Sequence, residues 1–334
     1  MKRINKYKMN FRKFGNTELI VSEIGFGAWA IGGGAMIGNT PIGWGDANDK
    51  TSKEAIYKSL EAGINFFDTA DIYGLGHSEE LIGNTIGARK DVVIASKAGN
   101  VSRNGAFTTD YSKEHILKAC EASLKRLKRA AIDFYQLHSA RLADLQKGEC
   151  IEAMQQLKQE GKIRYWGLSL PTFDPASEAE YLLNRQLGSG FQLVLNIINR
   201  VSVPLMKDAN AAGYGIIARM PLQFGLLSGK FGSQTSFPDN DHRKRRLPKE
   251  IIEEFSSRQS TLLLLSRKYG ITLAQLALSY LLSYPEVSTV IPGIRTPEQA
   301  LLNSGGIKIL NHDDLDQIDS IDFSPLMEMI RQRG

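Results

Sequence analysis

The sequence predicts a single α/β domain folded as a (β/α)8 barrel, and three observations point to this fold. Short apolar or β-branched runs alternate with longer stretches of helical period, which is typical of βα units around a parallel sheet. Eight such runs are spread evenly over the 334 residues, the number of strands that a closed barrel needs. Polar residues stand at the ends of several runs, where a barrel gathers its strand ends at one mouth.

The eight runs are the predicted strands, and the segments between them carry helix signals. The strands are residues 23–27, 65–69, 91–97, 132–138, 165–170, 192–196, 215–219 and 287–293. Thr51 or Ser52 can cap a helix that begins at Lys53, and Gly63 suits its left-handed end. Residues 110–127 place apolar side chains three and four positions apart, so we expect Cys120, one of them, in the core.

The remaining segments fit the two ends of such a barrel. Residues 11–21 suit a β-hairpin that turns at Gly15 and Asn16 and closes the bottom of the barrel. Residues 32–49 and 222–248 follow strand ends, so we expect long loops at the C-terminal face. The predicted organisation is an N-terminal extension (1–10), one barrel domain (11–325) and a C-terminal tail (326–334) that is either a short helix or disordered.

Composition excludes several classes of protein. No apolar run approaches the about 18 residues of a membrane span, and no apolar stretch follows the basic N-terminus, so neither a membrane protein nor a secretory signal is expected. With only Cys120 and Cys150, a disulfide framework is not expected and a cytoplasmic location is. The net charge of +5 is small, and its densest basic run, residues 243–246, lacks interleaved aromatics. We interpret that run as a solvated loop and predict no nucleic-acid partner.

Four ionisable residues at or just after strand ends form the candidate catalytic group: Asp68, Tyr73, Lys97 and His138. Each alone has an ordinary structural explanation, such as a helix cap or a core histidine, but a barrel brings them to one mouth. An ammonium lowers the pKa of a nearby phenol, which would tune Tyr73 as a general acid. A neutral histidine can orient and polarise a carbonyl oxygen. The five histidines form no ligand pair, so no metal site is predicted.

Ordered segments over essentially the whole chain resemble the aldo-keto reductase family. Residues 66–74 (FFDTADIYG) are similar to the segment with the catalytic aspartate and tyrosine, residues 94–97 to the one with the lysine, and residues 133–138 to the one ending in the histidine. The resemblance implies reversible reduction of an aldehyde or ketone to an alcohol. Hydride would come from the nicotinamide C4 of NADPH and the proton from Tyr73, tuned by Lys97 and Asp68, while His138 positions the carbonyl.

The resemblance also implies where the cofactor binds, NADPH by preference and NADH as the alternative. Ser169 and Gln192 match residues that bond the nicotinamide carboxamide, and Arg219 stands where some relatives place a stacking aromatic. The implied cofactor-binding residues are Ser169, Gln192, Arg219, Pro221, Leu222, Gly225, Leu227, Gly229, Lys230, Ile291, Gly293, Arg295, Gln299 and Asn303.

The chain departs from the family pattern at three cofactor positions. Leu170 follows Ser169 where many relatives have asparagine. Gln299 and Leu302 replace an arginine and an acid, which makes Arg295 the expected phosphate clamp.

The substrate is expected to be a small carbonyl compound bound by Trp44, Tyr73 and His138, with loop packing as the other explanation for Trp44. The chain is expected to be a monomer or a weak homo-oligomer. An alternative function is a cofactor-sensing regulatory or binding protein with little turnover, which the family's resemblance to channel-associated β-subunits permits.

Overall fold

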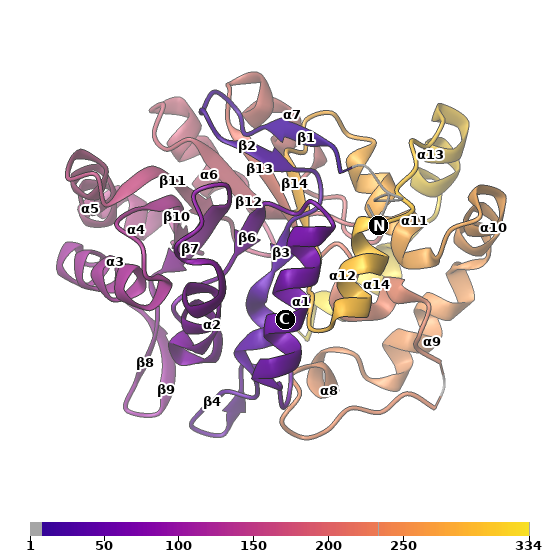
Figure 1. Cartoon of the computed structure of the whole chain (residues 1–334). Coiled ribbons are helices and arrows are strands. Elements are labelled where there is room, and N and C mark those ends of the chain that lie inside the picture. Colours follow the sequence, from indigo (N-terminus) through magenta and orange to yellow (C-terminus); the bar gives the residue numbers. More distant parts are fainter. Residues whose placement is uncertain (1–8, 233, 334) are drawn as a thin grey trace, which may run out of the picture.

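The computed structural model describes residues 9–232 and 234–333 and shows a closed barrel (Figure 1). Its parallel sheet has eight strands in the spatial order β14-β13-β12-β11-β10-β7-β6-β3. The two ends of this sheet meet, because Ile24, just before β3, forms a parallel bridge to Val290 in β14, and Gly27 in β3 forms one to Gly293, just after β14. The predicted (β/α)8 fold is confirmed.

The strands of the barrel lie where the sequence predicts them, with some ends displaced by a few residues. They are β3 (Phe26–Gly27), β6 (Phe66–Asp68), β7 (Val93–Ala98), β10 (Ile132–His138), β11 (Ile163–Ser169), β12 (Gly190–Val194), β13 (Gly215–Arg219) and β14 (Thr289–Ile291).

Helices cover the outside of the barrel (Figure 1). Ile116, Cys120 and Leu127 on α3 are fully buried, as their spacing predicts. The helices are α1 (Asp49–Glu61), α2 (His77–Ile86), α3 (Lys113–Leu127), α4 (Leu142–Lys147), α5 (Glu149–Gln159), α6 (Ala176–Asn184), α7 (Val203–Ala211), α8 (Arg243–Arg246), α9 (Lys249–Arg258), α10 (Ser260–Tyr269), α11 (Leu273–Leu282), α12 (Pro297–Ser304), α13 (His312–Asp319) and α14 (Ser324–Arg331).

Helix α1 begins earlier than predicted. The side chain of Asn48 accepts a hydrogen bond from the backbone N–H of Thr51 at 3.0 Å, so Asn48 is the cap and neither Thr51 nor Ser52 is. Gly63 has the expected left-handed conformation, with φ of 92°.

Helix α14 spans much of the predicted C-terminal tail and buries Leu326 and Ile330. Gly334, and residues 1–8 of the predicted extension, lie outside the described residues. The domain boundaries at residues 10 and 325 stay a prediction.

The N-terminal hairpin closes the bottom of the barrel, as predicted. Strands β1 (Phe11–Lys13) and β2 (Ile20–Ser22) pair antiparallel and lie at the top of the view in Figure 1. The Phe14 ring is fully buried against Phe134, with centroids 4.9 Å apart. A Cβ on Gly190 or Gly215 would lie 2.7 or 2.6 Å from the Phe14 ring, so these glycines make room for it.

Long loops surround the opposite end, also as predicted. They contain the hairpin β4 (Met36–Ile37) with β5 (Thr40–Pro41) and the 3-10 helices η1 (Ala28–Gly32) and η3 (Gln223–Ser228). A further hairpin, β8 (Asn100–Arg103) with β9 (Ala106–Thr109), is absent from the sequence prediction. Its turn carried the signal, because Asn104 and Gly105 have φ of 51° and 72°, the conformation that an Asn-Gly hairpin turn adopts.

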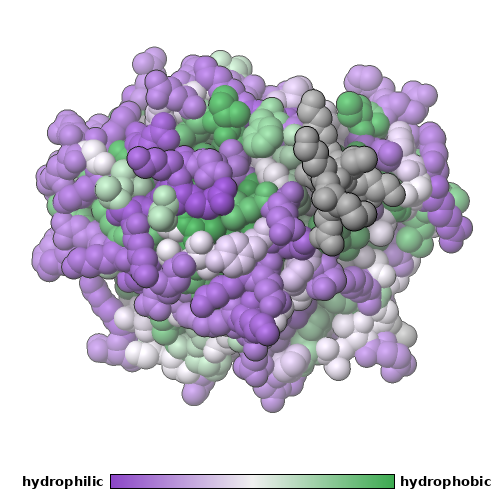
Figure 2. Space-filling view, viewed as in Figure 1, coloured by the Kyte–Doolittle hydropathy of each residue, from purple (hydrophilic) through white to green (hydrophobic). Residues whose placement is uncertain are grey.

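Apolar side chains fill both the barrel interior and the layer between strands and helices. A cluster around Phe14, Phe66, Phe134, Ile217 and Ile291 fills the barrel itself. The face in Figure 2 is largely hydrophilic, with small apolar patches between charged groups. Among the described helices, none combines the length and apolar character needed to cross a membrane.

Candidate active site

The four predicted catalytic side chains meet at the mouth of the barrel. Asp68 ends β6, Lys97 lies near the end of β7, His138 ends β10, and Tyr73 begins the 3-10 helix η2 (Tyr73–Gly76). Lys97 Nζ donates hydrogen bonds to Asp68 Oδ2 at 2.7 Å and to the carbonyl oxygen of Thr69 at 2.8 Å. The same Nζ donates to Tyr73 Oη at 3.4 Å, and the Tyr73 and His138 rings meet edge to face with centroids 5.9 Å apart.

The ion pair of Asp68 and Lys97 is buried and held from several strands. Asp68 Oδ1 accepts hydrogen bonds from Nε2 of Gln192 at 2.7 Å and of Gln136 at 3.3 Å. Burial is the largest influence on the pKa of Lys97 and lowers it, but Asp68 and Tyr73 together outweigh burial, so the pKa is raised. Lys97 is therefore an ammonium at neutral pH, fixed beside the Tyr73 hydroxyl.

The pKa of Tyr73 moves opposite to the direction that the sequence suggests. Burial raises this pKa, and it outweighs the lowering by Lys97 and Arg219. Lys97 lowers the pKa of Tyr73, as predicted, but removal of the phenolate from water raises this pKa by more. Tyr73 therefore carries its proton at neutral pH, with a cation in place for the phenolate that forms when the proton leaves.

His138 is a neutral imidazole at this site. Burial, with help from Lys97 and Arg219, holds the pKa of His138 well below its ordinary value. Its Nδ1 is buried and has no hydrogen-bond partner among the residues that the structure describes. Tyr111 Oη donates to the carbonyl oxygen of His138 at 2.6 Å, which fixes the end of β10. The arrangement suits a ring that hydrogen-bonds a ligand oxygen without carrying charge.

Arg219, the last residue of β13, brings a second cation to the mouth. Its Nη2 donates to the carbonyl oxygen of Leu170 at 3.0 Å and to Thr172 Oγ1 at 3.2 Å. Its Nε is buried without a partner, and no described carboxylate forms an ion pair with it. Burial lowers the pKa of Arg219, which Tyr73 and Asp68 partly offset. Arg219 as a whole is half-buried.

The other predicted cofactor residues form two groups. The first group lies on β11, on β12 and on the loop after β13. The Gln192 amide is already bonded to Asp68, and Leu227 is fully buried in the core. Gly225 and Gly229 adopt left-handed conformations with φ of 97° and 72°. The group comprises Ser169, Gln192, Pro221, Leu222, Gly225, Leu227, Gly229 and Lys230.

The second group lies on β14, on the segment between β14 and α12, and on α12 itself. Arg295 donates to the carbonyl oxygens of Trp44 at 3.1 Å and Asp46 at 2.5 Å, which ties that loop to α12. Gln299 Oε1 accepts from the backbone N–H of Arg295 at 2.7 Å. A Cβ on Gly293 would meet no atom within 4 Å. The group comprises Ile291, Gly293, Arg295, Gln299 and Asn303, of which Ile291 and Asn303 are buried.

Four ring side chains form one cluster that reaches Tyr73 through Trp29, and we call Trp29, Trp44, Phe224 and His242 the aromatic roof. Trp29 stacks on Tyr73 with centroids 5.9 Å apart and on His242 at 4.7 Å. Trp44 meets Trp29 at 5.6 Å and His242 at 4.6 Å, and Phe224 meets His242 at 5.0 Å. Of these four residues, only Trp44 is a predicted substrate-binding residue. The others come from distant loops and carry no motif, although Trp29 lies two residues after the end of the first barrel strand.

The basic run 243–246 is not the solvated loop that the sequence suggests. It forms α8, and Arg243 and Arg246 are half-buried against the roof. The Arg243 guanidinium lies 4.9 Å from the Trp44 ring, and that of Arg246 lies 5.1 Å from the Phe224 ring. Aromatic partners from other loops, which the local sequence does not contain, draw these arginines inward.

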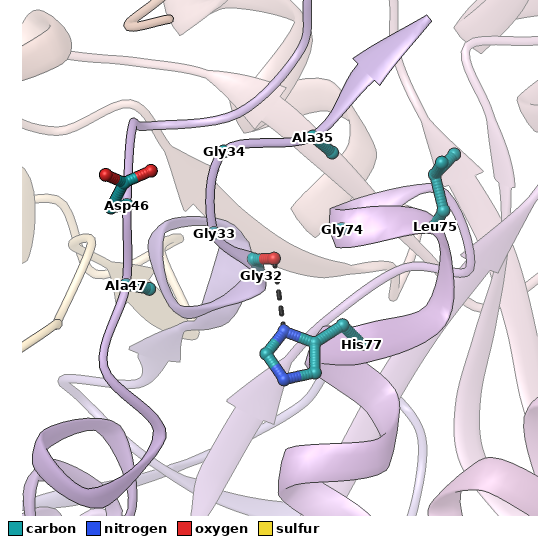
Figure 3. A pocket seen from close by; sticks show the side chains of 9 residues that line it. All are labelled: Gly32, Gly33, Gly34, Ala35, Asp46, Ala47, Gly74, Leu75 and His77. Carbon is teal, nitrogen blue, oxygen red and sulfur yellow. Dashed lines mark hydrogen bonds between the residues drawn. The ribbon is translucent and has the colours of Figure 1, made fainter.

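A hollow of about 520 Å³ lies between the loop of residues 32–35 and the segment Gly74–Leu75 (Figure 3). It is lined largely by backbone of residues 32–35 and by Asp46, Ala47, Gly74, Leu75 and His77. His77 Nδ1 contacts the carbonyl oxygen of Gly32 at 3.2 Å, as the dashed line in Figure 3 shows. None of the four catalytic candidates lines this hollow, so the chemistry belongs to the neighbouring cluster around Tyr73.

Comparison with known proteins gives consistent matches. The model of the Aldo/keto reductase family matches residues 23–322. The aldo-keto reductase YhdN of Bacillus subtilis is 31% identical over 330 residues, which cover 94% of this chain and 93% of that protein.

Two solved structures share the fold. The glycerol dehydrogenase of Gluconobacter oxydans has a TM-score of 0.78 at 26% identity, with 97% of this chain and 95% of that one covered. An aldo-keto reductase of Bacillus halodurans in its holo form has a TM-score of 0.76 at 26% identity, with 95% of this chain and 98% of that one covered.

Proposed function

Because the chain belongs to the aldo/keto reductase family and is an NAD(P)H-dependent oxidoreductase, we propose that it reduces an aldehyde or ketone with NADPH, using Tyr73 as proton donor. One observation carries this proposal. The protonated Tyr73 hydroxyl lies 3.4 Å from the Lys97 ammonium, which Asp68 holds at 2.7 Å, beside a neutral His138.

Each residue of the group has a distinct part in the reaction. A bound nicotinamide cofactor supplies the hydride. His138 donates a hydrogen bond that orients the carbonyl oxygen, and Tyr73 gives that oxygen its proton as negative charge develops. The Lys97 ammonium stabilises the resulting tyrosinate, and Asp68 keeps the ammonium in place.

The residues present fit a dinucleotide cofactor. Arg219 has a buried Nε without a partner, and His138 has a buried Nδ1 without one, so both offer unused polar atoms at the mouth. The Arg295 guanidinium donates to the backbone carbonyls of Trp44 and Asp46, and no described carboxylate forms an ion pair with it. The open space at Gly293 admits a ligand close to the backbone. Ser169, Arg219 and Arg295 would hold the cofactor, and Arg295 favours NADPH over NADH because it supplies a cation for the additional phosphate.

We further propose a cytoplasmic location and a monomer or weak homo-oligomer acting on a small carbonyl compound. Cys120 and Cys150 support the location, because both are free and buried, as suits a reducing compartment.

A labelled cofactor tests the proposal. Purified protein is mixed with a panel of aldehydes and ketones and NADPH deuterated at C4, and the alcohol is analysed by mass spectrometry. We expect one deuterium on the former carbonyl carbon and a higher kcat/KM with NADPH than with NADH. Arg295→Met should reduce that preference. Tight NADPH binding without turnover on any carbonyl would instead favour the regulatory alternative.

A further inference from the structure

The aromatic roof contains two buried polar atoms that have no partner among the described residues. They are Trp44 Nε1 and His242 Nε2. His242 Nδ1 lies 2.9 Å from Nη1 of Arg246, and because a guanidinium only donates, this Nδ1 must be the acceptor. The proton of the neutral imidazole is therefore on Nε2. Both unpartnered atoms are thus hydrogen-bond donors, and a buried donor without an acceptor is costly.

Arg246 adds a positive charge that no described carboxylate neutralises. Its guanidinium donates a hydrogen bond to His242 Nδ1, and it lies 5.1 Å from the Phe224 ring and 5.9 Å from the Trp29 ring. Burial, Arg245 and Arg219 lower the pKa of Arg246 to about 10, so it stays charged at neutral pH. The remaining guanidinium N–H groups are available to a ligand.

Arg243 provides the contrast within the same short helix. Its Nη2 lies 2.5 Å from Asp241 Oδ2 and its Nε 3.0 Å from Asp241 Oδ1, so its charge is neutralised by its own loop. Two arginines of one helix, in contact with the same roof, therefore differ in one respect. Arg243 is neutralised internally, and Arg246 is not.

The cluster of free donors lies one ring away from the candidate general acid. Trp29 stacks on both Tyr73 and His242, and the Arg246 guanidinium lies 5.9 Å from the same Trp29 ring, so one ring links Tyr73 to these donors. A ligand that places its carbonyl at Tyr73 could therefore place another group at the roof. The roof offers donors and positive charge, so the matching group is an anion rich in acceptors.

We propose that Arg246, with His242 and Trp44, binds an anionic group of the substrate, and that the substrates are carbonyl compounds bearing a carboxylate or a phosphate. This inference rests on the proposed function, because it concerns the anionic group of the same substrate whose carbonyl is reduced at Tyr73. It makes Arg246 a specificity-determining residue with no part in proton transfer.

Matched aldehydes test this assignment. The measurement is kcat/KM for 4-carboxybenzaldehyde against 4-methylbenzaldehyde, and for glyceraldehyde 3-phosphate against glyceraldehyde, in the wild type, Arg246→Met and the control Arg245→Met. Arg245 is the exposed neighbour of Arg246 and bears the same charge. We expect Arg246→Met to lose about 10- to 100-fold on at least one anionic aldehyde, the range for a lost hydrogen bond to a charged group. Neutral aldehydes should be nearly unaffected, and Arg245→Met should resemble the wild type.

A binding measurement keeps the inference falsifiable without turnover. Tryptophan fluorescence is quenched with 4-(hydroxymethyl)benzoate, 4-(hydroxymethyl)phenyl phosphate or 4-methylbenzyl alcohol. The quenching gives a Kd for each alcohol in the wild type, Arg246→Met and Arg245→Met. Tighter binding of the carboxylate or of the phosphate, lost in Arg246→Met, supports the assignment and identifies which anion the roof prefers.

Three outcomes would overturn the assignment. One is equal loss on charged and neutral aldehydes, and another is no difference in Kd between anionic and neutral alcohols. The third is a weaker Kd for NADPH in Arg246→Met, which would assign the arginine to the cofactor. The proposed function fails by a separate result, namely no reduction of any aldehyde while the anionic alcohol still binds through Arg246.

Discussion

The two ends of the barrel differ in whether their partly buried arginines have hydrogen-bond and ion-pair partners. At the bottom, Arg12 donates to Glu23 Oε1 at 2.7 Å and to the carbonyl oxygens of Leu282, Tyr284 and Val287 at 2.8–2.9 Å. At the mouth, Arg219 has an unpartnered Nε and Arg246 has no described carboxylate partner. The bottom uses its polar groups for stability, whereas the mouth leaves donors and positive charge available to ligands.

Lys97 differs from Arg219 and Arg246, because a carboxylate neutralises its charge. It is fully buried and pairs with Asp68, so this one cation serves both stability and the proposed chemistry. Arg219 and Arg246 have no such ion pair and therefore do not stabilise the fold in this way. This difference predicts which substitutions unfold the protein and which only inactivate it.

The largest effect is expected for Lys97→Met, which breaks both functions at once. Losing one partner of a buried ion pair costs about 3–5 kcal/mol of unfolding free energy, since Asp68 keeps an uncompensated charge. Turnover should fall by about 10²–10⁴-fold, the contribution of general acid catalysis. Urea unfolding and NADPH oxidation measure the two losses.

The double variant Asp68→Asn with Lys97→Met separates the two losses. Removing both charges should restore part of the stability, while activity stays lost. Restored activity in the double variant would show that the pair is only structural.

A smaller effect is expected at the bottom, for Arg12→Met. It should lower the unfolding free energy by about 1.5–3 kcal/mol, because it removes hydrogen bonds to a charged group, and leave kcat of the folded protein unchanged. Arg246→Met is the matched variant at the mouth, and it should be neutral or stabilising because it removes a half-buried, uncompensated charge. Equal destabilisation by the two variants in urea unfolding would erase the contrast between the ends.

The smallest effect concerns Asp71, an acid at the mouth. Burial and Glu79 raise the pKa of Asp71 to about 8, and its Oδ1 is buried without a described partner. The unfolded chain ionises this group at lower pH than the folded one, so its contribution to stability is lost as pH rises from about 4 to 8. Asp71→Asn should flatten the fall in Tm over this range. A variant with the same pH profile as the wild type would contradict this account.

Much of the fold could be predicted from sequence because it rests on local pattern. The apolar runs locate all eight barrel strands, and the spacing on residues 110–127 places Cys120 in the core. Two further local signals in the sequence, the cap at Asn48 and the turn at Asn104 and Gly105, were not predicted.

The site was predictable only in part, because much of it depends on contacts between distant segments. Strand ends identify the residues that meet around Lys97, since the barrel fixes where they converge. The aromatic roof depends on Trp29 meeting His242, more than two hundred positions away, which no local pattern encodes. The direction of the Tyr73 pKa depends on how deeply the ring is buried, and its chemical neighbours alone suggest the opposite sign.

Tyr73→Phe tests the central claim most directly, when kcat and the NADPH dissociation constant are measured on the same preparation. The phenol oxygen is the only group removed, so cofactor affinity should be unchanged and kcat should fall by about 10²–10⁴-fold. Turnover within a few-fold of the wild type would contradict the assignment of Tyr73 as the proton donor.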